Sequence, residues 1–193
     1  MTEDDPRHRV LEATYACVAR RGLAKTTVED AAREAGVSRA TVYRLFPGGR
    51  DEVVREMIGH ETAKFFLGLA DAVADAVDFT EVVEVALFHA HRAVGEHHVL
   101  QMLLAAEPER LLPALIDETN RLLPQIAAFV EPYLALEELR PGVGVGEAAD
   151  YVARMVVSHI NAQGRWDLTD REQVAELVRT EVLAGVLVRS GTA

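Results

Sequence analysis

The chain has 193 residues, of which 49% are hydrophobic and 26% are charged, and its formal net charge is −11. This hydrophobic content supplies a real core and argues against disorder. No apolar run reaches the roughly 18 residues that a membrane helix needs, and the first residues lack the positive-then-apolar pattern of a signal segment. The single cysteine, Cys17, excludes an internal disulfide and is read as a small buried hydrophobe. We therefore expect a soluble, cytoplasmic protein.

Charge is divided unevenly along the chain. Residues 1–50 hold nine Arg and Lys against seven Asp and Glu, whereas residues 51–193 hold eleven against twenty-four. Such asymmetry suggests an acidic body that carries a nucleic-acid-binding head. An acidic body repels DNA, which restricts DNA contact to the head.

The N-terminal segment predicts three helices. Pro6 favours the start of a first helix that ends at Gly22. Thr27 has the side-chain oxygen of an N-cap, with an acidic residue three positions on, and begins a second helix. Gly36 supplies the positive φ of a helix stop, and Ser38 caps a third helix. This spacing is typical of a helix-turn-helix.

The third helix has two different faces. Val42 and Leu45 point to one side, towards a core. The other side is rich in arginine and hydroxyl groups, which fits binding in a DNA groove lined by phosphates. Arginine binds guanine edges and phosphates, and hydroxyl groups bind phosphate oxygens. A small residue leaves room for a thymine methyl group. The alternative is an ordinary solvated helix. The candidate DNA-contacting residues are Thr26, Thr27, Ser38, Arg39, Ala40, Thr41, Tyr43, Arg44 and Arg50.

The segments VARRGL, TTVEDAAREAGV and SRATVYRLF resemble the DNA-binding domain of the TetR family of bacterial repressors. The most specific part is Tyr43–Phe46, followed by a short turn and an acidic helix start. The resemblance implies an all-α protein, with a helix-turn-helix domain in residues 1–49 and a helical effector-binding and dimerisation domain in residues 50–193. The turn is one residue longer than its commonest form, which leaves open whether Arg50 replaces the family's phosphate-contacting lysine.

The remainder of the chain has helical periodicity throughout. We expect a fourth helix from Asp51 to about Leu69, followed by helices over about 80–95, 98–106, 109–137, 147–163 and 170–189. Three prolines within 109–137 predict kinks or breaks. The last two helices have broad apolar faces, which fit either a central position or a two-fold dimer interface. The candidate interface residues are Val152, Val156, Val178, Val182 and Val186.

Methionine, aromatic and histidine side chains on the apolar faces are candidate lining for an effector cavity. These residues are Phe88, His89, Met102, Leu103, Leu122, Phe129, Met155 and His159, and each taken singly is also explained as ordinary core. His159 is the clearest polar member, so we expect a small, mainly apolar effector whose identity the sequence does not disclose.

The predicted function is a dimeric, ligand-responsive regulator, most simply a repressor that an effector releases from a palindromic operator. A metal-sensing regulator is the first alternative, because imidazoles on facing helices can bind zinc or nickel. The histidines of the body lack i, i+4 pairs and a cysteine neighbour, so we assign no metal site and no cofactor. Catalytic motifs are missing, which leaves a helical enzyme or carrier as the remaining alternative.

Overall fold

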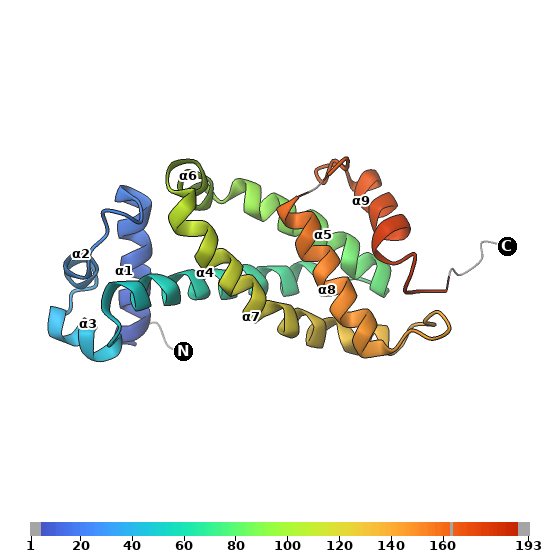
Figure 1. The fold of residues 1–193 in the computed structure, drawn as a ribbon, viewed down its shortest axis with the longest axis horizontal. Coiled ribbons are helices and arrows are strands. Elements are labelled where there is room, and N and C mark those ends of the chain that lie inside the picture. The colour runs from blue at the N-terminus through green and yellow to red at the C-terminus, as the bar shows by residue number, and fades with distance from the viewer. Residues whose placement is uncertain (1–4, 163, 189–193) are drawn as a thin grey trace. The chain divides into compact units, whose positions relative to one another are not determined.

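The computed structural model describes residues 5–162 and 164–188, and this part of the chain is helical (Figure 1). The only β-type pairing among these residues is a bridge between Leu139 and Leu187. The elements are α1 (Pro6–Arg21), α2 (Val28–Glu34), α3 (Arg39–Leu45), α4 (Gly49–Val73), α5 (Phe79–Glu96), α6 (His98–Ala106), α7 (Pro108–Leu134), α8 (Val145–Asn161), α9 (Arg171–Leu177) and the π-helical turn η1 (Val178–Val182). The all-α prediction is confirmed. No helix in the described ranges is long and apolar enough to cross a membrane.

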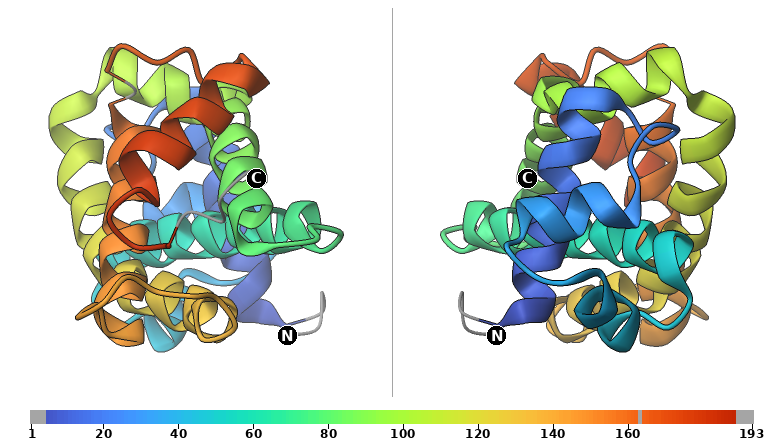
Figure 2. Two further views of the ribbon diagram at one scale, coloured as in Figure 1. Left: turned by 90° about the vertical axis from the view of Figure 1, so that its right-hand side faces the viewer. Right: turned by 90° about the vertical axis from the view of Figure 1, so that its left-hand side faces the viewer.

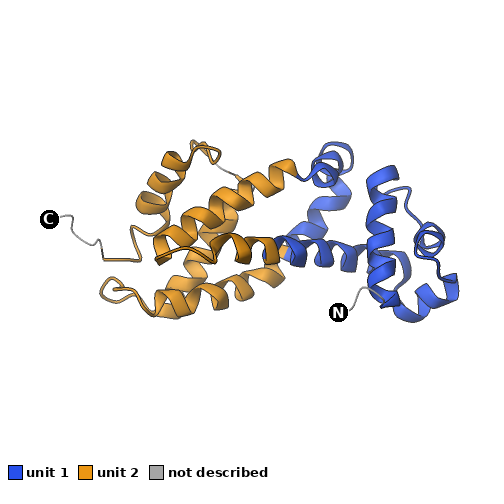
Figure 3. Cartoon of the chain, turned by 180° about the vertical axis from the view of Figure 1, so that it is seen from behind, with its two compact units in different colours: residues 1–66, 97–118 blue, residues 67–96, 119–193 orange. Residues whose placement is uncertain are grey.

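The chain forms two compact units, and neither is continuous in sequence (Figure 3). Unit 1 combines Met1–Phe66 with His97–Glu118, and unit 2 combines Leu67–Glu96 with Thr119–Ala193. Helices α4 and α7 each contribute to both units. These units differ from the expected segments 1–49 and 50–193, because α6 and the first part of α7 pack into the same core as the helix-turn-helix. The functional division at residue 50 stays a prediction.

Unit 1 is built on α1, which packs against α2 and α3 (Figure 2, right). The Asp5 side chain caps α1 by accepting a hydrogen bond from the Arg7 amide, and Pro6 occupies the first turn. Gly22 ends the helix at φ 81°. The inward faces bury a continuous apolar core, whose members include Val10, Val18, Val42, Phe46, Met57, Leu103 and Leu111.

Unit 2 has its own core, in which α5 contacts α8, α9 and η1 (Figure 2, left). Its largest fully buried side chains include Phe79, Leu87, Leu134, Leu168 and Leu177. The strong apolar periodicity of α5 and α8 explains this arrangement, because each helix has one apolar face to bury.

Two expectations about the C-terminal half need correction. First, α7 has no break at Pro113, Pro124 or Pro132. All three prolines are exposed, so water can hydrate the carbonyl groups that lose an amide partner. Second, the last helical segment ends at Val182 instead of reaching 189, a residue that lies outside the described part. The chain turns after Leu183, and the Val188 amide donates to the Glu138 carbonyl at 2.9 Å.

Candidate nucleic-acid interface

The helix-turn-helix forms as its sequence predicts. The Thr27 hydroxyl accepts a hydrogen bond from the Asp30 amide, and the Asp30 carboxylate accepts one from the Thr27 amide, which together make a capping box. Gly36 has φ 66°, and the Ser38 hydroxyl caps α3 by accepting a hydrogen bond from the Thr41 amide at 3.0 Å. The two caps fix the directions in which α2 and α3 leave their turns.

Asp30 also connects α2 to α1. Its carboxylate pairs with Arg21 at 2.8 Å and with Arg33, although the residue is only 8% exposed. The hydrogen bond from the Thr27 side chain lowers the pKa of Asp30 below its ordinary value of 3.8. Burial acts in the opposite direction, but the Thr27 amide, Arg21 and Arg33 also lower the pKa. The carboxylate is therefore held in its charged form.

We expect Asp30→Asn to lower the free energy of unfolding at pH 7. A depressed pKa stabilises the folded state above the ordinary pKa, and this contribution is lost as the pH falls through the folded-state value. The difference between wild type and variant should therefore shrink below about pH 3.8. Urea unfolding across this range measures the effect, with Glu109→Gln, an exposed carboxylate of α7 in unit 1, as the control. A difference that does not change with pH would contradict the role of the charge.

The outward face of α3 is exposed as predicted. Val42 is fully buried, whereas the side chains opposite it are open to solvent, namely Arg39, Ala40, Tyr43 and Arg44. The Thr41 side chain is half-buried, with its hydroxyl 2.9 Å from that of Ser38. Arginine, tyrosine and a small residue thus lie together on one short helix.

The two arginines of this face differ in their contacts. The Arg39 guanidinium pairs with Glu29 at 2.7 Å and lies over the Tyr43 ring. The hydrogen bond to the Tyr43 hydroxyl, together with the charge of Glu29, raises the pKa of Arg39. Within the described part of the chain, no hydrogen bond or ion pair engages the Arg44 side chain. Arg44 therefore offers all its donors to a ligand, while Arg39 must first leave or share its partners.

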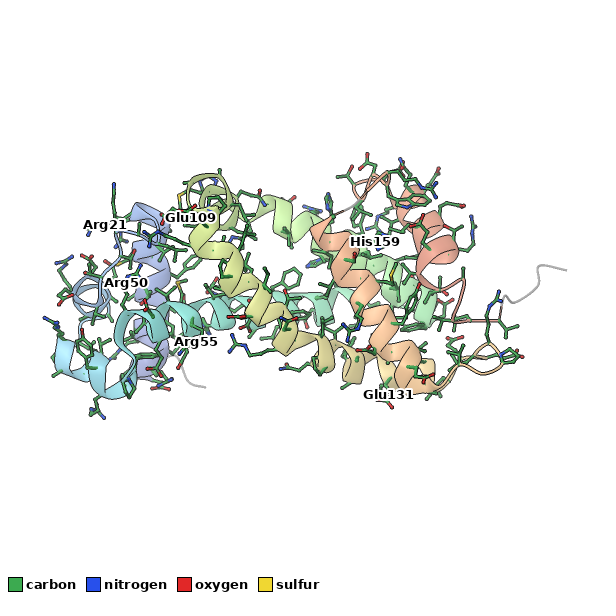
Figure 4. All side chains as sticks on the ribbon, viewed as in Figure 1. Arg21, Arg50, Arg55, Glu109, Glu131 and His159 are labelled. Atoms are coloured by element: carbon green, nitrogen blue, oxygen red, sulfur yellow. The ribbon has the colours of Figure 1, made fainter. Side chains whose placement is uncertain are left out.

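Two of the candidate DNA contacts have internal roles instead. Thr26 is 2% exposed, and its hydroxyl donates to the Gly22 carbonyl at 2.8 Å. Arg50 (Figure 4) donates to the Thr26 carbonyl at 2.8 Å and to the Leu23 carbonyl. The Arg50 guanidinium therefore braces the loop between α1 and α2, and we remove both side chains from the proposed contact surface. The turn before α4 is one residue longer than its commonest form, and Arg50 lies directly after this longer turn.

The turn between α3 and α4 supports the Tyr43 ring. Gly49 has φ 64°, and a Cβ atom there would lie 3.1 Å from Tyr43 Cε1. A side chain at this position would thus be strained and would crowd the ring. Glycine at position 49 allows the turn to approach the tyrosine closely.

Arg7 joins the start of α1 to the end of α3 and to α4. Its guanidinium donates to the Leu45 carbonyl and to the Glu56 carboxylate, each at 2.5 Å, and lies 4.4 Å from the centre of the Phe46 ring. Phe46 itself is completely buried. This contact fixes the C-terminal end of α3, which carries Tyr43 and Arg44.

The candidate effector residues are divided between the two units. Met102 and Leu103 belong to unit 1, where they line a surface hollow of about 410 Å³ together with Arg20, Arg21, Lys25 and Glu107. The other members belong to unit 2. His159 on α8 (Figure 4) is 8% exposed, with Nδ1 2.8 Å from the Met155 carbonyl and Nε2 3.6 Å from the Glu181 carboxylate. Both ring nitrogens already face protein groups, so a ligand would have to replace one of them.

The five candidate interface valines are buried inside unit 2. Val152, Val178 and Val182 are completely buried, and Val156 and Val186 are 9% and 3% exposed. They belong to the core shared by α5, α8, α9 and η1. These side chains are therefore already buried within one chain. They could form a dimer interface only if the core of unit 2 were rearranged.

One constellation escaped the sequence reasoning. His8 and Glu12 on α1 and His60 on α4 place their ligand atoms within 4.8 Å of one another. The spacing of His8 and Glu12 is i, i+4, which was available from the sequence. His60, however, lies 48 residues after Glu12, and only the tertiary packing of α4 against α1 brings it to this pair.

A helix-turn-helix with an arginine- and tyrosine-bearing second helix, followed by a helical body, defines a DNA-binding transcriptional regulator. Residues 10–57 match the family model described as "Bacterial regulatory proteins, tetR family". The N-terminal part of the chain is a DNA-binding domain of the TetR family, and relatives that match more of the chain are HTH-type transcriptional regulators rather than enzymes.

Relatives with the same kind of domain match the chain in sequence, and a solved structure has a similar fold. The chain is 27% identical over 170 residues to an uncharacterised HTH-type transcriptional regulator of Mycobacterium tuberculosis, covering 88% of this chain and 82% of that protein. It is 30% identical over 99 residues to another such regulator, of Mycobacterium bovis, covering 51% of this chain and 50% of the relative. The TetR family repressor AlkX from Dietzia has a similar fold, with a TM-score of 0.63, 22% identity and coverage of 95% and 96%.

Proposed function

We propose that this protein is a dimeric, ligand-responsive repressor that inserts α3 into the major groove of a palindromic operator. The observation that carries the proposal is the exposed face of α3, on which the Arg44 donors have no protein partner within the described residues and Tyr43 is 41% exposed. Capped helix N-termini at Thr27 and Ser38 add amide groups that favour phosphate. Operator binding requires access to the chromosome, so the same proposal places the protein in the cytoplasm.

A dimer supports this function on energetic grounds. One helix-turn-helix makes few base contacts, and two copies related by a two-fold axis read two half-sites. The five candidate interface valines are buried within one chain, so the proposed dimer must form through other residues. Sedimentation at micromolar concentration tests the assembly, and a strictly monomeric protein would contradict it.

The effector is proposed to be a small, mainly apolar molecule that binds unit 2. Phe88 and Met155 support this, because both are partly exposed apolar side chains packed at the edge of the second core. An effector releases DNA only if it binds the DNA-incompetent conformer more tightly. A typical coupling of roughly 1–3 kcal/mol would lower operator affinity about 5–150-fold. Screening compounds for release of a selected operator tests this part.

The central experiment selects an operator from random duplexes and then compares two arginine variants. Arg44→Ala should weaken binding by about 5–150-fold, because one good arginine contact to a base contributes roughly 1–3 kcal/mol. The control Arg92→Ala removes the same charge from an exposed position on α5 and should change affinity less than about twofold. Equal affinities of wild type and Arg44→Ala would contradict the proposed face.

Salt dependence gives a second expected result. Arginines that neutralise phosphates release counterions, so the logarithm of the affinity should fall linearly with the logarithm of salt concentration. If Arg44 contacts a phosphate, Arg44→Ala should reduce this slope by about one per subunit. If Arg44 contacts a base, the slope should stay the same while the preference at one operator position weakens. An affinity independent of salt would contradict DNA binding altogether.

A further inference from the structure

Unit 1 contains a group of metal-ligating side chains outside the DNA-facing surface. His8 and Glu12 lie one turn apart on α1, and His60 projects from α4. The Glu12 carboxylate oxygen Oε1 is 2.8 Å from His60 Nε2 and 3.9 Å from His8 Nε2. The two imidazole rings meet edge to face, with centroids 4.9 Å apart. Two helices that are distant in sequence therefore direct three ligand atoms to one point.

The dimensions of the group fit a transition metal. With bonds of about 2.0–2.2 Å, the ligand atoms of a tetrahedral zinc ion lie roughly 3.3–3.6 Å apart. The two Glu12 contacts, at 2.8 and 3.9 Å, bracket this spacing. All three ligand atoms lie within 4.8 Å of one another, so small side-chain movements would bring them around one ion. Two imidazoles and one carboxylate are ligands that zinc accepts, and three protein ligands leave a fourth position for water.

The two histidines of the group are partly shielded from solvent. The His60 and His8 side chains are 14% and 21% exposed. The ligand atoms are thus partly shielded, while an ion can still enter from solvent.

One neighbour competes with a cation. Lys64 Nζ lies 3.3 Å from the same Glu12 oxygen. It also lies 3.0 Å from Glu61 Oε1, one turn back on α4, and its side chain is half-exposed. Lys64 can therefore turn away from Glu12 and keep an ionic partner, so its presence lowers the affinity for a metal without closing the site.

We propose that His8, Glu12 and His60 form a binding site for a divalent transition metal ion of the zinc type, which links α1 to α4 within the DNA-binding unit. A bound ion would replace the present hydrogen bond with two or three coordinate bonds between these helices. Because α1 supports α2 and α3, the ion would reinforce the scaffold of the DNA-binding surface. This site is separate from the histidines of unit 2 and does not depend on the proposed effector.

The test uses the full chain without a histidine tag. Zinc is titrated into wild type and into His8→Asn, His60→Asn and Glu12→Gln, with isothermal titration calorimetry as the readout. His98→Asn is the matched control, because His98 is an exposed histidine in unit 1 outside the group. Wild type should bind one equivalent with micromolar or tighter affinity, and each ligand variant should weaken binding at least about tenfold. The control should bind like wild type.

Two further measurements keep the result decisive. Cobalt bound in place of zinc should give the intense visible absorption of a four-coordinate site in wild type and lose it in the ligand variants. Zinc should raise the melting temperature of wild type and of His98→Asn but not of His8→Asn, which remains informative if His60→Asn fails to fold. Binding no tighter than millimolar in wild type, or binding that survives in both His8→Asn and His60→Asn, would overturn the proposal.

Discussion

Replacement of Val182 by glutamate is expected to unfold unit 2 rather than only separate two subunits. Val182 is completely buried in a core shared with α5, α8 and α9. The described residues that form this core are apolar, so a carboxylate there must either remain charged in an apolar environment or take up a proton, and the cost is about 3–5 kcal/mol. This is a large fraction of a typical domain stability of roughly 5–15 kcal/mol.

The control for this result is Val188→Glu, which places the same charge at a residue that is 37% exposed. Urea unfolding monitored by circular dichroism should show a large loss of stability for Val182→Glu and little change for Val188→Glu. If Val182→Glu instead gives a stable, folded monomer, the valine must belong to a subunit interface and the burial argument is wrong.

Replacement of Phe46 by alanine is expected to destabilise unit 1 by about 3–5 kcal/mol, the usual cost of removing a buried aromatic ring. The ring is completely buried, and the Arg7 guanidinium lies on one of its faces. Its loss leaves a cavity at the junction of α3 and α4, so operator binding should fall together with stability.

Tyr43→Ala separates stability from recognition. Tyr43 is three residues before Phe46 but is exposed on the DNA-facing side. The variant should keep nearly the melting temperature of wild type and lose operator affinity, whereas Phe46→Ala should lose both. If Tyr43→Ala retains full operator affinity, Tyr43 lies outside the DNA interface, and the proposed contact surface would be limited to Arg44 and its other neighbours on α3.

Local signals predicted the helix-turn-helix well, because its determinants lie within a few residues of one another. The capping box at Thr27, the positive φ at Gly36 and the cap at Ser38 are all short-range features. The burial of Val42 likewise follows from helical periodicity. Such features depend little on the rest of the chain.

Predictions that depended on tertiary partners were less successful. Arg50 was a candidate DNA contact whose role the sequence left open, and two backbone carbonyls more than 20 residues away in sequence accept its hydrogen bonds. The apolar stripe that contains Val182 fits either a core or an interface by pattern alone, and only the arrangement of α5 against it decides. Periodicity identifies a face that must be buried, but it does not say which surface buries it.

The discontinuous composition of unit 1 has a consequence for how the protein folds during synthesis. Leu103 and Leu111 belong to the same core as Val42 and Phe46, but they are translated after the whole of α5. A nascent chain that ends near residue 66 therefore lacks part of the unit 1 core. Completing that core requires the segment between residues 66 and 97, which includes α5, to be closed into a loop at a cost in chain entropy. The DNA-binding unit can complete itself only after the start of α7 has left the ribosome. An isolated N-terminal fragment, excised at the end of the helix-turn-helix, would for the same reason expose apolar surface and be a poor substitute for the full chain.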